Sequence, residues 1–197
     1  MTARDRVRLL IVSISVLLCL GALTAAAAAP RHAPNPASAS DAAGTLRIRP
    51  QPARVDAGGT VTVQVWLENA GNYYGMDFKI VFEKAKVSVP SGNVTLLWEV
   101  FDPDNHFAIK NSVTSVDATH SQVWYSVTNL IPAEPFTGTG RLCSITFSGI
   151  AEGTTLLDFT YAKGSTRDGG ALYPTQVDGA IVVGQMYRSR LPVVAVQ

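Results

Sequence analysis

Five side chains stand out because they combine charge, hydrogen-bonding groups and one large aromatic ring at alternate positions of predicted strands. Asp77 and Lys79 alternate with apolar residues in one segment, and Gln122, Trp124 and Ser126 do so in another. Successive side chains of a strand point to opposite faces, so we expect each set to lie on a solvent-facing side. A tryptophan among polar groups is typical of a protein-binding patch, where aromatic anchors supply much of the binding energy.

Groups that could catalyse a reaction form no recognisable pattern in the sequence. His106 and His120 stand alone, and there is no serine in a Gly-x-Ser-x-Gly elbow. The carboxylates are scattered, so their spacing singles out no pair for glycoside hydrolysis. Cys143 falls on the apolar side of its predicted strand, where a thiol behaves as an inert small hydrophobe. The sequence therefore predicts a protein that is not an enzyme.

A metal site is the next chemistry to consider. Asp102, Asp104 and Asn105 place three oxygen-bearing side chains close together in FDPDN. Calcium takes six to eight oxygen ligands, and no glutamate follows at the spacing of a calcium loop. We expect a plain turn here, and neither a metal nor another cofactor on this chain. The triplet that begins at Asn93 matches a glycosylation acceptor, but so short a motif also occurs by chance.

The N-terminal 29 residues have the composition of a secretory signal. Arg4, Arg6 and Arg8 precede a short apolar run that ends in a series of alanines. An uncleaved membrane anchor is the alternative, because the run reaches about 20 residues when the alanines are counted. We expect an exported protein, secreted or associated with the cell surface, that meets the membrane only through this segment.

Charge and cysteine content narrow the partners of the exported part. Removing residues 1–29 takes away three arginines and Asp5, which changes the formal net charge from +1 to −1. A nearly neutral chain is not expected to bind nucleic acid. Only Cys143 remains after cleavage, so no internal disulfide can form and the core alone must stabilise the domain.

Three further segments follow the signal. Residues 30–44 are rich in proline, alanine and serine, which predicts a flexible linker. Residues 45–184 are predicted to form one domain, long enough to bury roughly two thirds of its unfolded surface. Residues 185–197 leave the strand pattern and are expected to be a C-terminal tail.

The predicted domain is built from short strands with alternating apolar residues, separated by turn-forming residues. No helical period lasts longer than two turns, which indicates an antiparallel β-sandwich or barrel. A loop is expected over 50–59 and 131–140, a turn over 69–72, and either a strand or a helical turn over 94–101. Strands are expected over 46–49, 60–68, 72–83, 86–89, 106–110, 122–129, 141–149, 154–162 and 176–184.

Alternation also predicts which side chains fill the core. Each of the longer strands should bury one set of alternate residues. The expected sets are Val61, Val63, Val65 and Leu67; Met76, Phe78, Ile80 and Phe82; Val123, Tyr125 and Val127; Cys143, Ile145 and Phe147; and Leu157, Phe159 and Tyr161.

Four segments in this order resemble the cohesin domains, the β-sandwich receptors of bacterial scaffolding proteins that hold dockerin-bearing enzymes. DAGGTVTVQVWLEN is similar to the family's glycine turn and T-V-x-V-x-V-x-L strand, and YYGMDFKIVFE to its Y-G-x-D-F-x-L-x-Y strand. GTGRLCSITFSGIAEGTTLLDF resembles the G-x-G-x-L-x-x-I-x-F strand with its following glycine turn, and VDGAIVV the closing D-G-x-I-x-V. Together they span residues 45–184.

The resemblance implies an all-β, nine-stranded jelly roll with the third, fifth, sixth and eighth strands in one sheet. It also implies a protein partner similar to a dockerin, with any calcium on the partner. Cohesins use an asparagine and an aspartate two residues apart to contact dockerin; the matching positions are Gly75 and Asp77, of which only the aspartate agrees. The family's Y-D-P is also missing, since Phe82, Glu83 and Lys84 stand there. The expected partner-binding residues are Gly75, Asp77, Lys79, Gln122, Trp124, Ser126 and Asp158.

Alternatives remain open at this stage. Trp124 could be covered by residues 93–116, in which case it serves local packing. Trp66 points away from the apolar side of its own strand. The resemblance places that strand in the other sheet. If both tryptophans nevertheless shared one face, they would form a stacking platform for a polysaccharide, and the domain would be a carbohydrate-binding module. A structural or adhesion domain without a dedicated ligand is the third hypothesis.

Overall fold

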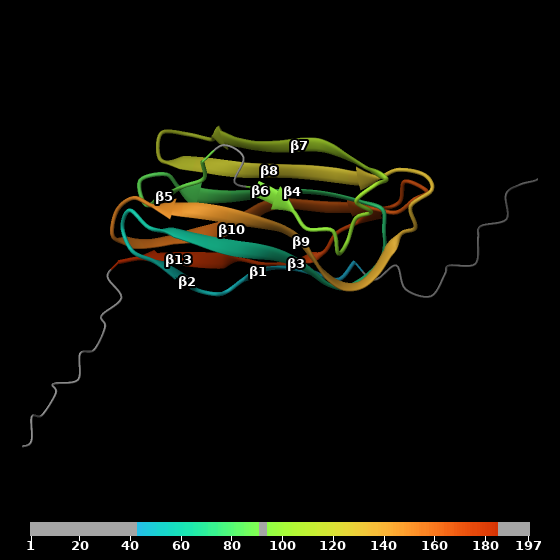
Figure 1. The fold of residues 1–197 in the computed structure, drawn as a ribbon, viewed down its shortest axis with the longest axis horizontal. Helices are drawn as coiled ribbons and strands as arrows, with labels where there is room; N and C mark the ends of the chain where they lie inside the picture. The colour runs from blue at the N-terminus through green and yellow to red at the C-terminus, as the bar shows by residue number, and fades with distance from the viewer. Residues whose placement is uncertain (1–42, 91–93, 185–197) are drawn as a thin grey trace, which may run out of the picture. The chain divides into compact units, whose positions relative to one another are not determined.

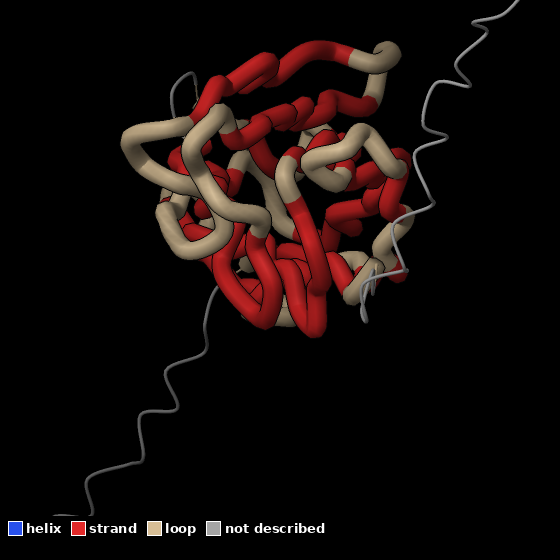
Figure 2. Tube along the Cα trace, turned by 90° about the vertical axis from the view of Figure 1, so that its right-hand side faces the viewer, coloured by secondary structure: helices blue, strands red, loops and turns tan. Residues whose placement is uncertain are grey.

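Strands and loops make up the whole of the fold that the computed structural model describes, namely residues 43–90 and 94–184 (Figures 1 and 2). Within these ranges there is no helix, and hence none that could cross a membrane. The predicted signal, the tail, nearly all of the predicted linker, and Asn93 lie outside the described residues.

The strands form two sheets, and the all-β sandwich expected from the sequence is confirmed. The first, here the β3 sheet, has the order β12-β1-β3-β9-β5, with β6 also paired to β9. Its strands are β1 (Thr45–Arg49), β3 (Thr60–Tyr73), β5 (Val87–Ser88), β6 (Val94–Leu96), β9 (Phe136–Gly149) and β12 (Thr175–Val177).

The second, here the β4 sheet, has the order β2-β13-β10-β4-β8-β7, with β11 paired to β10. In Figure 1, β7 runs along its upper edge beside β8. The third, fifth, sixth and eighth of the predicted strands are neighbours in this sheet, as expected. Its strands are β2 (Ala53–Val55), β4 (Gly75–Glu83), β7 (His106–Ser115), β8 (His120–Asn129), β10 (Gly153–Ser165), β11 (Ala171–Leu172) and β13 (Gly179–Val183).

The core lies between the sheets and is built mainly from alternate apolar residues of β3, β4, β8, β9 and β10. Phe78 of β4 is fully buried, with its ring centroid 5.5 Å from that of Tyr125 and 6.0 Å from that of Phe159. Phe82 of the β4 sheet meets Phe147 of the β3 sheet edge to face, with ring centroids 5.3 Å apart. Such aromatic pairs add to the burial term that stabilises a sandwich.

Several predicted boundaries were wrong because local turn signals do not reveal long-range pairing. The expected loop 50–59 contains β2, which pairs in parallel with β13. The expected strand 176–184 is two strands in different sheets, β12 and β13. β9 begins inside the expected loop 131–140, at Phe136. The structure thus has thirteen strand segments in its described part, several of only two or three residues, where nine strands were expected.

The expected turn over 69–72 is instead an irregular part of β3. Asn69 and Asn72 have φ angles of 52° and 62°, a left-handed conformation that asparagine tolerates. The backbone amides of these residues donate to the hydroxyls of Thr139 and Thr137 on β9, at 3.1 and 3.2 Å. Side-chain oxygens therefore replace the missing carbonyl partners, and the strand continues to Tyr73.

Tyr161 was expected in the core but lies outside it. The pairing of β10 with β4 shifts between Phe159 and Tyr161, so one extra residue interrupts the alternation. Ala162 takes the next inward position and is 6% exposed, whereas Tyr161 is 38% exposed. The bulge therefore adds an aromatic ring to the outer face of the β4 sheet.

Candidate functional site

Trp124 lies half-buried on the outer face of the β4 sheet, held at its polar edge and covered by two cations. Its indole Nε1 donates to Oδ1 of Asp77 at 2.8 Å. The ammonium nitrogens of Lys79 and Lys110 lie 4.3 and 5.1 Å from the centroid of the ring. A cation at this distance from an indole is attracted to it, so the ring and both lysines form one ordered group.

Strand register explains why these side chains meet. On β4 and β8, Asp77 is paired with Ser126, and Lys79 with Trp124. On β7, Lys110 is paired with Ser126. Side chains on directly paired or diagonal positions of one face are within contact distance. The alternation in the sequence therefore placed Asp77, Lys79 and Trp124 together correctly, whereas Lys110 was not expected there.

β10 supplies two more residues that the sequence did not predict. Tyr161 is paired with Lys79 and Lys163 with Asp77, and the Lys79 ammonium lies 5.8 Å from the centroid of the Tyr161 ring. The bulge in β10 decides on which side of the sheet these two residues lie, so regular alternation could not have identified them. We call the resulting surface the Trp124 face; it comprises Asp77, Lys79, Lys110, Trp124, Tyr161 and Lys163.

A shallow groove of about 320 Å³ adjoins the Trp124 face at the end where β4 begins. Gly75, Ser126, Thr128 and Ser165 line it together with Ile109, which is 58% exposed. Ser126 is only 6% exposed, and a Cβ on Gly75 would lie 2.6 Å from the Ser165 hydroxyl oxygen. The expected contact residues Gly75 and Ser126 therefore shape the groove rather than project from the surface.

Charge on the Trp124 face is unbalanced. Neither Lys79, Lys110 nor Lys163 forms an ion pair with a described residue, and the carboxylate of Asp77 bonds to the indole. Asp77 and Lys79 do not form the simple charge pair that their spacing suggests. The lysines carry the same charge and lack a carboxylate partner among the described residues, so this face gains from an incoming negative charge.

Two of the expected contact residues lie away from the indole. The amide of Gln122 donates to the Thr114 hydroxyl on β7, at 3.2 Å. Asp158 is exposed and paired with Val81; it lines a separate hollow of about 160 Å³ together with Glu83 and His120. Neither side chain contributes to the Trp124 face.

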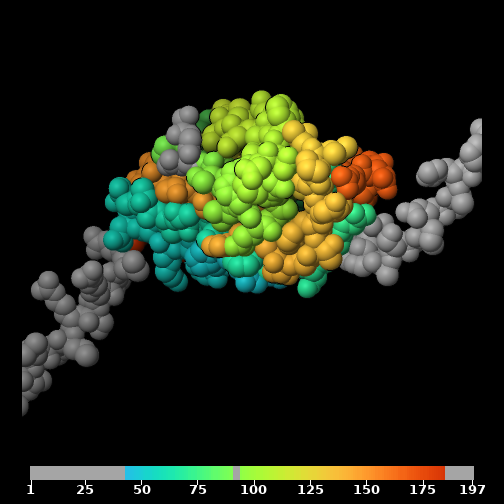
Figure 3. All heavy atoms as spheres, turned by 45° about the vertical axis from the view of Figure 1, so that its right-hand side comes forward, coloured from blue at the N-terminus to red at the C-terminus, as the bar shows by residue number. Residues whose placement is uncertain are grey.

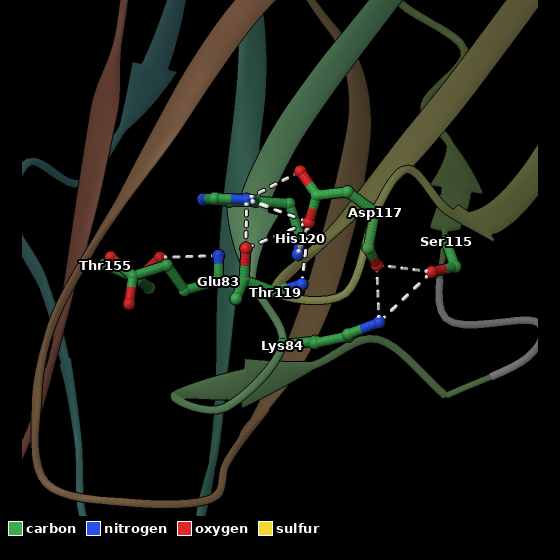
Figure 4. Close-up of polar contacts among 7 residues, drawn as sticks. All are labelled: Glu83, Lys84, Ser115, Asp117, Thr119, His120 and Thr155. Carbon is green, nitrogen blue, oxygen red and sulfur yellow. Dashed lines mark hydrogen bonds and ion pairs between the residues drawn. The ribbon is translucent and has the colours of Figure 1, made fainter.

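His120 has a carboxylate partner, contrary to the expectation that it stands alone. Figure 4 shows its ring beside Asp117 in the turn between β7 and β8, with Nδ1 3.1 Å from Oδ2. The backbone amide of Thr119, followed by that of His120, donates to this carboxylate and holds the pKa of Asp117 well below its usual range. The nearby Ser115 hydroxyl donates to the Asp117 carbonyl. These groups close the hairpin and leave no free nucleophile there.

Asp102 and Cys143 lie as the sequence predicts, in a turn and in the core. Asp102 accepts hydrogen bonds from the backbone amides of Asp104 and Asn105, at 2.8 and 3.0 Å, so FDPDN is a turn. Among the described residues there is no group of three or more potential metal-ligating side chains. Cys143 is fully buried, and burial raises the pKa of its thiol far above the usual range.

A second tryptophan surface lies on the outside of the β3 sheet. Nε1 of Trp66 donates to Gln64 at 3.2 Å, and the guanidinium carbons of Arg49 and Arg141 lie 5.1 and 5.9 Å from the ring centroid. Both tryptophans are therefore flanked by two cations, but in different sheets. This excludes a stacking platform shared by Trp66 and Trp124.

The cations around Trp66 are paired, unlike the lysines around Trp124. Glu68 forms ion pairs with Arg47 and Arg49. The carboxylate of Glu99 accepts hydrogen bonds from both the guanidinium and the backbone amide of Arg141. The side-chain hydrogen bond from Arg141 is the main cause that lowers the pKa of Glu99. We call this surface the Trp66 face; it comprises Arg47, Arg49, Gln64, Trp66, Glu68, Glu99 and Arg141.

Residues 94–116 do not roof the Trp124 face. β6 pairs with β9 in the opposite sheet, and Figure 3 shows the bright green segment that follows it beside the orange β9. β7 extends the β4 sheet at its edge, and its Lys110 reaches the Trp124 ring from there. This segment therefore contributes one side chain to the packing of Trp124, and the indole stays partly exposed beside it.

No protein-family model and no curated protein sequence matches the chain. Solved structures do. The cohesin OlpC of Clostridium thermocellum, in a complex with the dockerin Doc435, has a TM-score of 0.58 at 14% identity, over 75% of this chain and 98% of that one. The seventh ScaB type I cohesin of Pseudobacteroides cellulosolvens has a TM-score of 0.55 at 17% identity, over 75% and 96% of the two chains.

A cohesin that is not part of a cellulosome shares the same fold. The protein from the archaeon Archaeoglobus fulgidus has a TM-score of 0.53 at 15% identity, over 73% of this chain and 92% of that one. Nearly the whole of each of these cohesins is thus covered, although identities this low indicate the fold alone. Taken with the sheet order, these matches show that the described part of the chain has a cohesin-like fold.

Proposed function

We propose that this chain is a non-catalytic protein-recognition module that binds a dockerin-like partner through the Trp124 face. Several of the similar cohesins were solved in complexes with dockerins, which supports a partner of this kind. The observation that carries the proposal is the state of the Trp124 face: an ordered indole, exposed aromatic and aliphatic side chains nearby, and lysines that form no ion pair with a described residue.

Each part of this face has a physical role in docking. Trp124 offers a large, rigid surface whose hydrogen bond to Asp77 limits the entropy lost on binding. Tyr161 and Ile109, both exposed, extend the apolar area on either side of it. Anchors of this type at protein interfaces contribute about 2 kcal/mol or more when truncated.

The proposal includes export, as the signal-like N-terminal residues predict, and places the protein outside the cell or at its surface. Calcium belongs to the dockerin-like partner in this account and not to this chain. Specificity should differ from that of cohesins with the asparagine–aspartate pair, because Gly75 lines a groove and Asp77 is bonded to Trp124.

The test is capture of dockerin modules by the exported domain. A varied panel of calcium-loaded dockerins is immobilised, and binding of the wild type is compared with that of a Trp124→Ala/Asp77→Ala double variant and a Trp66→Ala control. We expect the double variant to lose binding, while the control retains it and circular dichroism shows that both stay folded.

Full binding by the double variant would place the interface elsewhere. Absence of binding to every dockerin, together with retention on cellulose, chitin or xylan, would replace this proposal by the carbohydrate-binding alternative. Blank results in both assays would favour a structural or adhesion domain.

A further inference from the structure

We propose that the partner presents an acidic side chain to the Trp124 face, and that its carboxylate binds the ammonium group of Lys79 or Lys110 beside the indole. This inference rests on the proposed function and adds to it the chemistry of the partner surface. It predicts a partner with aspartate or glutamate at the centre of its interface.

The geometry around the indole provides the first argument. Both ammonium nitrogens lie within 5.1 Å of the centroid of the same ring, Lys79 from β4 on one side of β8 and Lys110 from β7 on the other. An ammonium group has three donors, and neither lysine uses them in an ion pair with a described residue. A carboxylate that enters beside the indole can accept a charge-assisted hydrogen bond from either lysine, and its charge offsets that of both.

The surrounding residues extend the same preference. Lys163 is exposed and forms no ion pair with a described residue. In the sheet it lies directly opposite Asp77 on the neighbouring strand. The 38% exposed Tyr161 lies next to Lys79 and carries a hydroxyl that can donate to an anion. Asp77, the one carboxylate of this face, is held by the indole and is not within ion-pair distance of a lysine.

The Trp66 face shows what a completed arrangement of this kind looks like in the same molecule. There, Glu68 is bound by Arg47 and Arg49 beside the ring, and Glu99 is bound by Arg141. The Trp124 face has the tryptophan and the two cations but lacks the corresponding carboxylates. A partner can supply them, whereas a basic or uncharged partner would leave the lysines desolvated without a counter-charge.

The experiment uses the indole N–H signals of the exported domain in two-dimensional ¹H–¹⁵N NMR, assigned with single Trp→Phe variants. The probes are the peptides hexaglutamate and hexalysine, added at constant ionic strength. We expect hexaglutamate to shift the Trp124 signal saturably and to leave that of Trp66 in place, and we expect hexalysine to shift neither.

The matched variants change two lysines each. Lys79→Gln/Lys110→Gln should weaken hexaglutamate binding by about tenfold or more, as expected when a charge-complementary contact is removed. Lys84→Gln/Lys86→Gln should leave it unchanged, because these two ammonium groups bond to backbone carbonyls of Asp117 and Glu152. An equal response of both variants, or an equal shift with hexalysine, would overturn the inference.

A second arm separates this inference from the proposed function. If a dockerin binds through Trp124 but binds Lys79→Gln/Lys110→Gln as tightly as the wild type, the acidic contact is wrong and the dockerin-binding function stands. If no dockerin binds but hexaglutamate still shifts Trp124 in a lysine-dependent way, the carboxylate site stands and the dockerin proposal is wrong.

Discussion

The two tryptophan surfaces of this domain have the same components in different electrostatic states. Each places an indole on the outside of a sheet, bonds its N–H to a side chain and puts two cations near the ring. On the Trp66 face the arginines bind Glu68 and Glu99, whereas on the Trp124 face the lysines bind no carboxylate among the described residues.

This difference shows why an exposed tryptophan alone does not identify a binding surface. Where the surrounding charges are already paired, a partner must break ion pairs before it can form new ones. Where they are unpaired, binding completes an arrangement that folding leaves open. Arginine also suits the paired face, because its planar fork binds a carboxylate in a fixed geometry, while lysine stays mobile and hydrated.

The largest expected difference between the faces is in partner affinity. Trp124→Ala should weaken binding to a captured dockerin by at least about 2 kcal/mol, roughly 30-fold, because it removes the anchor. Trp66→Ala should change it less than about twofold, since that face makes no contact. Isothermal titration calorimetry with both variants measures the two effects; equal losses would abolish the distinction between the faces.

The next largest effect should be the dependence of partner affinity on ionic strength. If exposed lysines attract an acidic partner, raising salt from about 0.05 to about 0.5 M should weaken wild-type binding by roughly tenfold through screening. In Lys79→Gln/Lys110→Gln the slope of affinity against salt should be clearly smaller. Biolayer interferometry over this salt range gives both slopes, and a wild-type affinity that does not depend on salt would rule out the electrostatic part of the account.

Removing charge should lower the stability of the fold on the Trp66 face but not on the Trp124 face. Glu68→Gln breaks two ion pairs and leaves Arg47 and Arg49 without a partner, so we expect a loss of about 1 kcal/mol in the free energy of unfolding. Lys79→Gln/Lys110→Gln should change it little, because the loss of the two cation–π contacts is offset by the relief of repulsion between like charges. Urea unfolding distinguishes these outcomes; a destabilised lysine variant would mean that the lysines already have a structural role.

Acid should affect the paired face first, and this is the smallest of the expected effects. Arg141 lowers the pKa of Glu99 in the folded state, so this pair contributes stability above the unfolded pKa and loses it as the pH falls through the folded pKa. Glu99→Gln should therefore flatten the dependence of the melting temperature on pH below about 4.5. The Lys79→Gln/Lys110→Gln curve should keep the slope of the wild type there, because this variant leaves every carboxylate in place.

The sequence predicted most of what regular alternation determines. The buried sets of β3, β4, β8 and β9 were correct except for Val61, which is only partly buried. The outward side of Asp77, Lys79 and Trp124 was also correct. The resemblance also placed Trp66 in the other sheet correctly. Each of these features depends on the alternation of residues within a strand or on the order of the strands, and both can be read from one sequence.

What the sequence could not predict depends on register between distant strands. The bulge in β10 reversed the side of Tyr161 and brought Lys163 to the Trp124 face, and the pairing of β7 with β8 added Lys110. Whether a cation has a partner is equally a long-range property, since Arg141 and Glu99 are 42 residues apart. The electrostatic contrast between the faces therefore appears only in three dimensions.

Oxidative footprinting of the tryptophans in a complex with a captured dockerin tests the central claim most directly, because both surfaces report from one molecule. Hydroxyl radicals modify exposed indoles, and mass spectrometry quantifies the peptides containing Trp66 and Trp124 separately, with and without the partner. The account predicts that the partner protects Trp124 strongly and leaves oxidation of Trp66 unchanged. Protection of Trp66 with Trp124 still fully reactive would contradict it.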